Sequence, residues 1–183
     1  STQCDGALTR LMQYLEGTKN ASLKQIVNSD TTNWEIEVMV DSDFAGDRET
    51  RKSTGGVLIS ISHPAGQRSL IDWVSKLQTC TSISTAEAEC ISIVNGVKRA
   101  MKIANLLGSL LGRTITVNVH SDASAAIGAI KSGYSRRLAH IGRTHGVNLS
   151  WTHEIFEKDE HNLLKISTSE NAADALTKAL PTA

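Results

Sequence analysis

A change of hydrophobic period along the chain limits its possible folds more than any other sequence feature. Apolar residues alternate with polar ones over residues 34–41, and two more strand-like runs follow at 57–61 and 70–74. From residue 88 to 107 the apolar residues recur instead at helical spacing. A period of two that gives way to one of about 3.6 predicts a meander of three antiparallel strands followed by a long helix.

Beyond the long helix, strand-like and helix-like segments alternate. A β-like run at 114–120 precedes a helix-like segment at 123–130, and residues 163–166 predict a last strand. Residues 167–170 (STSE) predict the cap of a final helix. A meander followed by such alternation indicates an α/β fold in which a mixed sheet is flanked by helices.

Two helices carry clear boundary signals. The long helix starts with Ser84-Thr85-Ala86-Glu87, the pattern of a capping box. Near the start of the chain, residues 5–16 predict a short amphipathic helix that ends at Gly17. We expect one main domain with a short N-terminal appendage.

Composition excludes several classes of protein. With 40% hydrophobic and 21% charged residues, the chain is typical of an ordinary globular protein. Three cysteines without a Cys-x-x-Cys pair argue against a disulfide framework or a zinc site and favour a reducing, intracellular compartment. No apolar stretch of about 18 residues occurs, so we expect neither a membrane span nor a signal peptide. The 19 basic and 19 acidic side chains cancel, so any contact with nucleic acid must come from a local patch.

Four acidic residues lie at the ends of different predicted elements. Asp41 ends the first strand and Asp122 the fourth, while Glu89 lies in the first turns of the long helix and Asp174 in the last helix. Each alone is more typical of a turn or a cap. Were they to converge, their mutual repulsion would require a cation, and Mg²⁺ prefers such oxygen ligands. Spacing alone does not establish that convergence.

Six blocks of the sequence resemble, in order, the ribonuclease H domain of copia-type retrotransposon polyproteins. They are VDSDFAGD (40–47), RKSTGG (51–56), WVSKLQ (73–78), STAEAE (84–89), HSD (120–122) and ENAADALTK (170–178). In addition, LMQYLEGT (11–18) resembles the end of the reverse transcriptase region that precedes this domain in such polyproteins.

The resemblance implies a ribonuclease H-like fold with five strands, three in an antiparallel meander and two parallel. It implies that residues 31–183 form the ribonuclease H domain and that 1–30 are a helix and linker from the reverse transcriptase side. It also implies a catalytic, metal-binding quartet, carried over onto Asp41, Glu89, Asp122 and Asp174. We expect two Mg²⁺ ions with substrate, for which Mn²⁺ can substitute, to activate a water and stabilise the leaving oxygen.

Neighbouring acids compete for two of these places. Asp43 could share the face of Asp41, and Glu87 competes with Glu89, although Glu87 has a structural role in the capping box. The family pattern favours Asp41 and Glu89. The sequence departs from that pattern at Phe44, at Ala123-Ser124 and around 140–145, and these departures concern the rate and the substrate contacts rather than the metal centre.

Small polar and basic residues near the acids are the candidates for substrate contacts. Hydroxyl groups can read the 2′-hydroxyls in the shallow minor groove of an RNA–DNA hybrid, and bases can hold phosphates. The candidates are Ser42, Arg51, Lys52, Lys76, Ser84, Thr85, Ser124, His140 and Arg143, with Arg136 and Arg137 as further phosphate ligands. Trp73 and Trp151 are predicted to lie in the core.

The favoured function is an endonuclease that cuts the RNA strand of RNA–DNA hybrids during reverse transcription. The expected partners are the hybrid and a fused or adjacent reverse transcriptase, and the expected location is cytoplasmic, including virus-like particles, or nuclear. Two alternatives stay open: a decayed copy that binds nucleic acid without cutting it, and a nuclease of the same superfold that acts on DNA.

Overall fold

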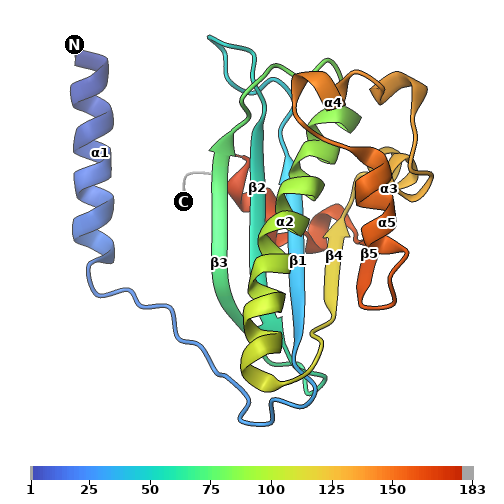
Figure 1. The fold of residues 1–183 in the computed structure, drawn as a ribbon. Helices are drawn as coiled ribbons and strands as arrows, with labels where there is room; N and C mark the ends of the chain where they lie inside the picture. Colours follow the sequence, from blue (N-terminus) through green and yellow to red (C-terminus); the bar gives the residue numbers. More distant parts are fainter. Residues whose placement is uncertain (1, 179–183) are drawn as a thin grey trace.

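The central feature of the computed structural model, which describes residues 2–178, is one five-stranded mixed sheet in the order β3-β2-β1-β4-β5 (Figure 1). β2 pairs antiparallel with both β1 and β3, whereas β4 pairs parallel with β1 and with β5. The strands are β1 (Glu35–Ser42), β2 (Thr54–Ser62), β3 (Arg68–Leu77), β4 (Val117–Ser121) and β5 (His161–Lys165). The predicted mixed sheet, with its meander and two parallel strands, is confirmed.

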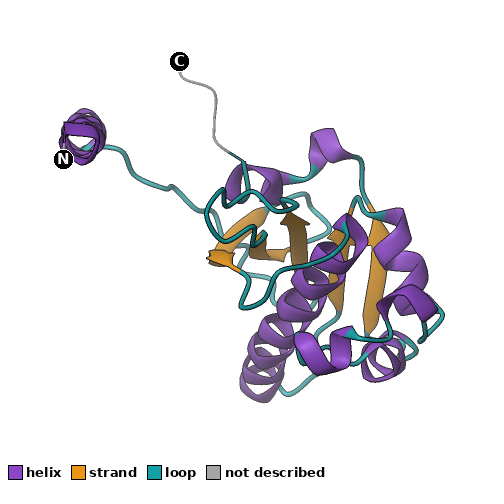
Figure 2. Cartoon of the chain, turned by 90° about the horizontal axis from the view of Figure 1, so that it is seen from above, coloured by secondary structure: helices purple, strands orange, loops and turns teal. Residues whose placement is uncertain are grey.

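Helices lie on both sides of this sheet (Figure 2). The α-helices are α1 (Thr2–Thr18), α2 (Thr85–Leu111), α3 (Ser124–Lys131), α4 (Ile141–Thr144) and α5 (Leu149–Phe156). The 3₁₀ turns are η1 (Arg136–Leu138), η2 (Thr168–Glu170) and η3 (Ala172–Leu176). α2 packs on one face, in front of β1 in Figure 1, and η3 contacts β1 and β2 from behind. None of the helices in the described residues is long and apolar enough to cross a membrane.

The core lies between α2 and the central strand. Ile36, Val38 and Val40 of β1 are fully buried. A Cβ atom added to Gly96 of α2 would lie 2.7 Å from Cγ1 of Val40, closer than real contacts allow. The helix therefore approaches β1 closely because a glycine stands at that point, and this close packing fixes the position of its first turns.

The start of α2 confirms half of the predicted capping box. Ser84 is the N-cap, and its Oγ accepts a hydrogen bond from the backbone N–H of Glu87 at 3.2 Å. The reciprocal bond is different, since Oε2 of Glu87 accepts from the N–H of Ile83 at 3.0 Å rather than from Ser84. The first bond satisfies a backbone donor that a helix start leaves without a partner, and the second satisfies the N–H of the residue that precedes the N-cap.

The predicted final helix is wrong in kind over the described residues. Residues 168–176 form two short 3₁₀ turns, and residues 179–183 lie outside the described part of the chain. Asn171, rather than Ser167, caps η3, with Oδ1 accepting from the N–H of Ala173 at 3.3 Å. Its Nδ2 also donates to the backbone oxygen of Val40 at 2.9 Å. This bond holds the segment against β1 and breaks a continuous helix at residue 171.

Two other expectations need correction. Trp73 is 59% exposed, because it lies on the edge strand β3 and faces away from α2, whereas its neighbour Val74 packs towards the core. Residues 135–157, to which the sequence analysis assigned no helix or strand, form η1, α4 and α5. The short N-terminal helix is confirmed as α1, which lies apart from the sheet in Figure 1 with its apolar residues exposed.

Candidate metal centre

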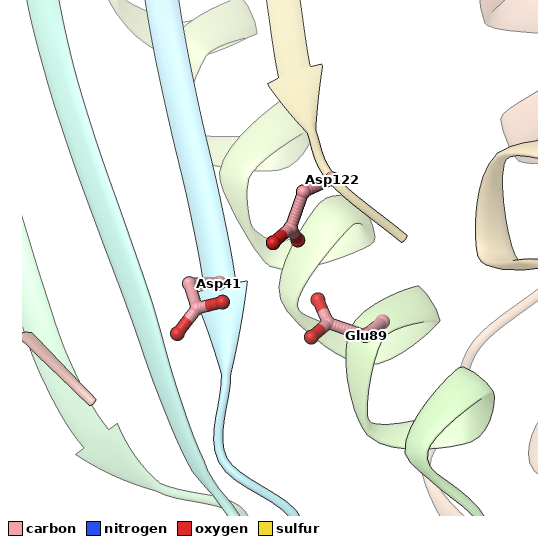
Figure 3. A group of neighbouring side chains, drawn as sticks. All are labelled: Asp41, Glu89 and Asp122. Carbon is pink, nitrogen blue, oxygen red and sulfur yellow. The ribbon is translucent and has the colours of Figure 1, made fainter. Parts of the chain in front are cut away.

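Three of the four predicted acids converge at one end of the sheet (Figure 3). Asp41, Glu89 and Asp122 each offer a carboxylate oxygen, and these oxygens all lie within 4.8 Å of one another. Asp41 and Glu89 are buried, at 3% and 5% exposure, and Asp122 is half-buried. We call these three residues the acid cluster.

The topology of the sheet produces this convergence. β1 and β4 are parallel neighbours, so Asp41 near the end of β1 and Asp122 just after β4 reach the same edge. α2 begins at that edge as well, which brings Glu89 in its second turn to the end of β1. Oε1 of Glu89 accepts a hydrogen bond from the N–H of Ser42 at 3.3 Å. Functional groups commonly gather at such strand ends in α/β sheets.

The electrostatics of the acid cluster favour protonation in the absence of a cation. Burial raises the pKa of Glu89 to about 8, and the charges of Asp41 and Asp122 add to the effect. Burial also raises the pKa of Asp41, against the hydrogen bond from Thr177. Oε2 of Glu89 and Oγ of Ser42 are buried without a hydrogen-bond partner among the described residues.

These features fit a hard divalent cation. The donor set consists of carboxylate oxygens alone, which are the ligands that Mg²⁺ and Mn²⁺ prefer. A buried carboxylate oxygen without a partner is costly, and a cation would remove that cost together with the mutual repulsion of the three acids. Asp41, Glu89 and Asp122 are therefore the residues that would hold the ion.

Two hydroxyl groups that were not predicted orient the acid cluster. Oγ1 of Thr177 donates to Oδ2 of Asp41, and Oγ1 of Thr168 donates to Oδ2 of Asp122 at 2.6 Å. Outer hydrogen bonds of this kind fix the direction of metal-binding carboxylates. Thr177 lies inside the family motif at 170–178, but the motif does not reveal which atom it contacts.

Asp174 lies close to the acid cluster without being one of its members. It is part of η3, and its Oδ1 pairs with Nζ of Lys178. Its charge acts on the cluster, since it contributes to the raised pKa of Asp41. The assignment of Asp174 as a fourth ligand remains a prediction.

The two competing acids have structural partners. Oδ1 of Asp43 accepts a hydrogen bond from the N–H of Thr54. Glu87 is 1% exposed, and its two oxygens face Nε2 of His140 at 3.1 Å and Nε2 of His145 at 3.0 Å. His140 therefore faces the helix start rather than the acid cluster.

The other candidate substrate residues are spread around this end of the fold. Ser42 is buried beside Glu89, Ser84 is the N-cap of α2, Thr85 is exposed at its start, and Ser124 accepts from Nζ of Lys165. The exposed basic candidates are Arg51, Lys76, Arg136, Arg137 and Arg143, while Lys52 is half-buried. Their contacts with substrate remain predictions.

Comparison with curated proteins relates the chain to transposon polyproteins. No protein-family model matches it. It is 35% identical over 176 residues to the retrovirus-related Pol polyprotein from transposon TNT 1-94 of Nicotiana tabacum, an alignment that covers 96% of this chain and 12% of that polyprotein. The corresponding polyprotein from transposon RE1 of Arabidopsis thaliana is 27% identical over 177 residues, which cover 95% of this chain and 11% of the polyprotein. The chain thus spans only a small part of these relatives.

Solved structures establish the fold. LC11-RNase H1, isolated from compost, superposes with a TM-score of 0.51 at 18% identity, covering 78% of this chain and 91% of that one. The same enzyme in complex with an RNA/DNA hybrid gives a TM-score of 0.50 at 16% identity, covering 78% and 93%. The RNase H domain of PFV gives a TM-score of 0.51 at 14% sequence identity, covering 79% of this chain and 90% of that domain. The predicted ribonuclease H-like fold is confirmed.

Proposed function

We propose that this chain hydrolyses the RNA strand of RNA–DNA hybrids. It has the ribonuclease H fold and is homologous to one segment of the Pol polyproteins of copia-type retrotransposons. The observation that carries the proposal is the acid cluster, in which Asp41, Glu89 and Asp122 meet around a buried carboxylate oxygen without a partner. The similarity of the fold to LC11-RNase H1, which has been crystallised with an RNA/DNA hybrid, supports the choice of substrate.

In this proposal, Asp41, Glu89 and Asp122 hold divalent ions, with Asp174 as the fourth ligand. Bound Mg²⁺ supplies activation of the attacking water and neutralises charge on the scissile phosphate. The chain itself orients the acids, since Thr177 fixes Asp41 and Thr168 fixes Asp122. The half-buried Asp122 leaves the cluster open to substrate.

The context that we propose is a larger Pol polyprotein in which the chain lies next to a reverse transcriptase. The small fraction of each relative that it spans supports this context. The intracellular location expected from the cysteine pattern belongs to the same proposal.

The decisive test is cleavage of a hybrid with a labelled RNA strand in Mg²⁺ or Mn²⁺. We expect cleavage by the wild type and none by Asp122→Asn, because the change removes one ligand charge while keeping the shape of the side chain. Asp159→Asn is the matched control, since Asp159 is exposed and lies at the other end of β5. Activity that survives in Asp122→Asn would refute the proposal.

Two outcomes would support the alternatives instead. Binding of the hybrid without cleavage at any metal concentration would indicate a binding module, and equal cleavage of double-stranded DNA would indicate a nuclease of broader specificity.

A further inference from the structure

A second cavity lies beside the acid cluster, between α2 and the β2–β3 hairpin. Its volume is about 350 Å³, and its walls include Lys76 of β3 and Lys98, Arg99 and Lys102 of α2. None of the described residues that line it is acidic. In a chain with 19 basic and 19 acidic side chains, this is a marked local excess of positive charge.

The lysines of this basic cavity have no carboxylate partner among the described residues. Arg99 is neutralised, because its Nε and Nη2 each donate to a carboxylate oxygen of Asp72 at 2.9 Å. Lys98 lies over the ring of Trp151, with Nζ 5.6 Å from its centroid, whereas Lys76 and Lys102 are exposed. The charges of Lys76, Lys98 and Lys102 are thus available to an anion.

A buried hydroxyl group points to a ligand as well. Ser92 is 1% exposed and lines the basic cavity, and its Oγ has no hydrogen-bond partner among the described residues. A Cβ atom added to Gly55 would lie 2.8 Å from this oxygen, so a glycine is what leaves the hydroxyl its space. A buried donor without a partner costs free energy that an incoming acceptor oxygen would recover.

We propose that the basic cavity binds a backbone phosphate of the nucleic acid whose RNA strand lies at the acid cluster, an inference that rests on the proposed function. The two sites are adjacent, since Ser92 follows Glu89 by one turn of α2 and Gly55 pairs with Ser42 in the sheet. A duplex carries one negative charge per about 1.7 Å of its axis. A hybrid that lies at the acid cluster therefore also presents a backbone phosphate to the basic cavity. Phosphate contacts fix the register of a duplex on a protein.

The first experiment measures binding of a fluorescent hybrid by anisotropy in EDTA, where no cleavage occurs. We expect Lys76→Ala and Lys102→Ala each to weaken binding several-fold and to lower the slope of log Kd against log salt by about one. Lys158→Ala is the matched control, because Lys158 is exposed on the turn after α5 and lines no part of the basic cavity. Wild-type affinity and slope in both cavity variants would overturn the proposal.

Ser92→Ala separates binding from folding. Removal of a buried hydroxyl without a partner should leave the melting temperature unchanged or raise it, while hybrid affinity falls several-fold. A lower melting temperature with unchanged affinity would show that the hydroxyl only stabilises the fold and would contradict the proposal.

Two further arms identify the source of the phosphate and separate this proposal from the function. Inorganic phosphate and adenosine monophosphate are titrated as free ligands. If Lys76→Ala and Lys102→Ala lose affinity for these small probes but keep the wild-type affinity for the hybrid, the assignment to a backbone phosphate is overturned. If the wild type cleaves no hybrid in Mg²⁺ yet its hybrid binding depends on Lys76 and Lys102, the proposed function fails and the phosphate site stands.

Discussion

Glu87 and Glu89 lie two residues apart on α2, and both are buried, yet their surroundings are opposite. Oε2 of Glu87 accepts a hydrogen bond from the N–H of Ile83. Its two oxygens also lie 3.1 Å from Nε2 of His140 and 3.0 Å from Nε2 of His145, which are ion-pair distances without the geometry of a hydrogen bond. Glu89 has one contact with a backbone N–H at 3.3 Å, an oxygen without a partner, and two other carboxylates beside it.

The difference separates a structural acid, Glu87, from a proposed metal ligand, Glu89. Burial of a carboxylate is costly unless partners compensate its charge. For Glu87 the chain supplies those partners and thereby attaches the loop that contains α4 to the start of α2. For Glu89 the chain adds more negative charge, so compensation has to come from outside the chain.

The largest difference between the two residues should appear in catalysis. We expect Glu89→Gln to lower hybrid cleavage more than about 100-fold, because it removes the charge of a proposed metal ligand. Partners that only hydrogen-bond to a ligand are already worth 10–100-fold. Glu87→Gln should cost about tenfold or less. Single-turnover cleavage rates at saturating Mg²⁺ make the comparison, and equal losses in both variants would abolish the distinction.

Stability should show the reverse order. Glu87→Ala leaves the buried imidazole of His145 without its acid and should lower the free energy of unfolding by about 3 kcal/mol. Glu89→Gln replaces a carboxyl group that is mostly protonated at pH 7 without metal, so it should leave the stability of the metal-free protein nearly unchanged. Urea unfolding in EDTA measures both, with Glu154→Ala on the exposed side of α5 as a control. A stable Glu87→Ala variant would contradict the structural role.

The pH dependence of stability sharpens the comparison further. The pKa of Glu89 is raised from 4.5 to about 8 in the folded chain, so the folded state binds more protons than the unfolded state between these values. Stability in EDTA should therefore fall as pH rises, by about 2 kcal/mol between pH 6 and pH 8 from this group. Glu89→Gln should flatten the profile, and an equally steep profile in that variant would exclude Glu89 as its source.

The smallest effect should be the change in stability when Mg²⁺ is added. If Mg²⁺ binds the acid cluster with a dissociation constant near 1 mM, then 5 mM should add about 1 kcal/mol of stability, a rise of roughly 2–4 °C in melting temperature. Glu87→Gln should keep this rise and Asp122→Asn should lose it. An Asp122→Asn variant that Mg²⁺ stabilises as much as the wild type would place the ion elsewhere.

The sequence predicted which acidic residues matter better than it predicted which side chains surround them in the fold. Strand alternation and helix capping are local properties, and they placed Asp41, Glu89 and Asp122 at the ends of elements. Their selection as metal ligands came from the resemblance to the family. The contact of Glu87 with His140 and His145 could not, since it depends on how the chain between α3 and α5 folds back onto α2. That region was also where short helices went undetected: α5 has eight residues and depends on tertiary packing more than on its own propensity.

Trp73 illustrates the same limit on a strand. Its size favours burial, but edge position and facing direction decide its exposure, and neither can be derived from composition. The final 3₁₀ segment likewise depends on Asn171, whose bond to Val40 joins residues far apart in the sequence.

The same bond has a consequence for how the chain is made. Val40 lies in the first strand of the sheet, and Asn171 follows the last strand, 131 positions further along the chain. Synthesis at about 5–20 residues per second separates their emergence from the ribosome by seconds. During that interval the residues of β1 have been synthesised, but Asp41 has no Thr177 to orient it. A ribosome that stalls soon after Asp122 would therefore carry Asp41, Glu89 and Asp122 in a nascent chain that still lacks the threonines that orient Asp41 and Asp122.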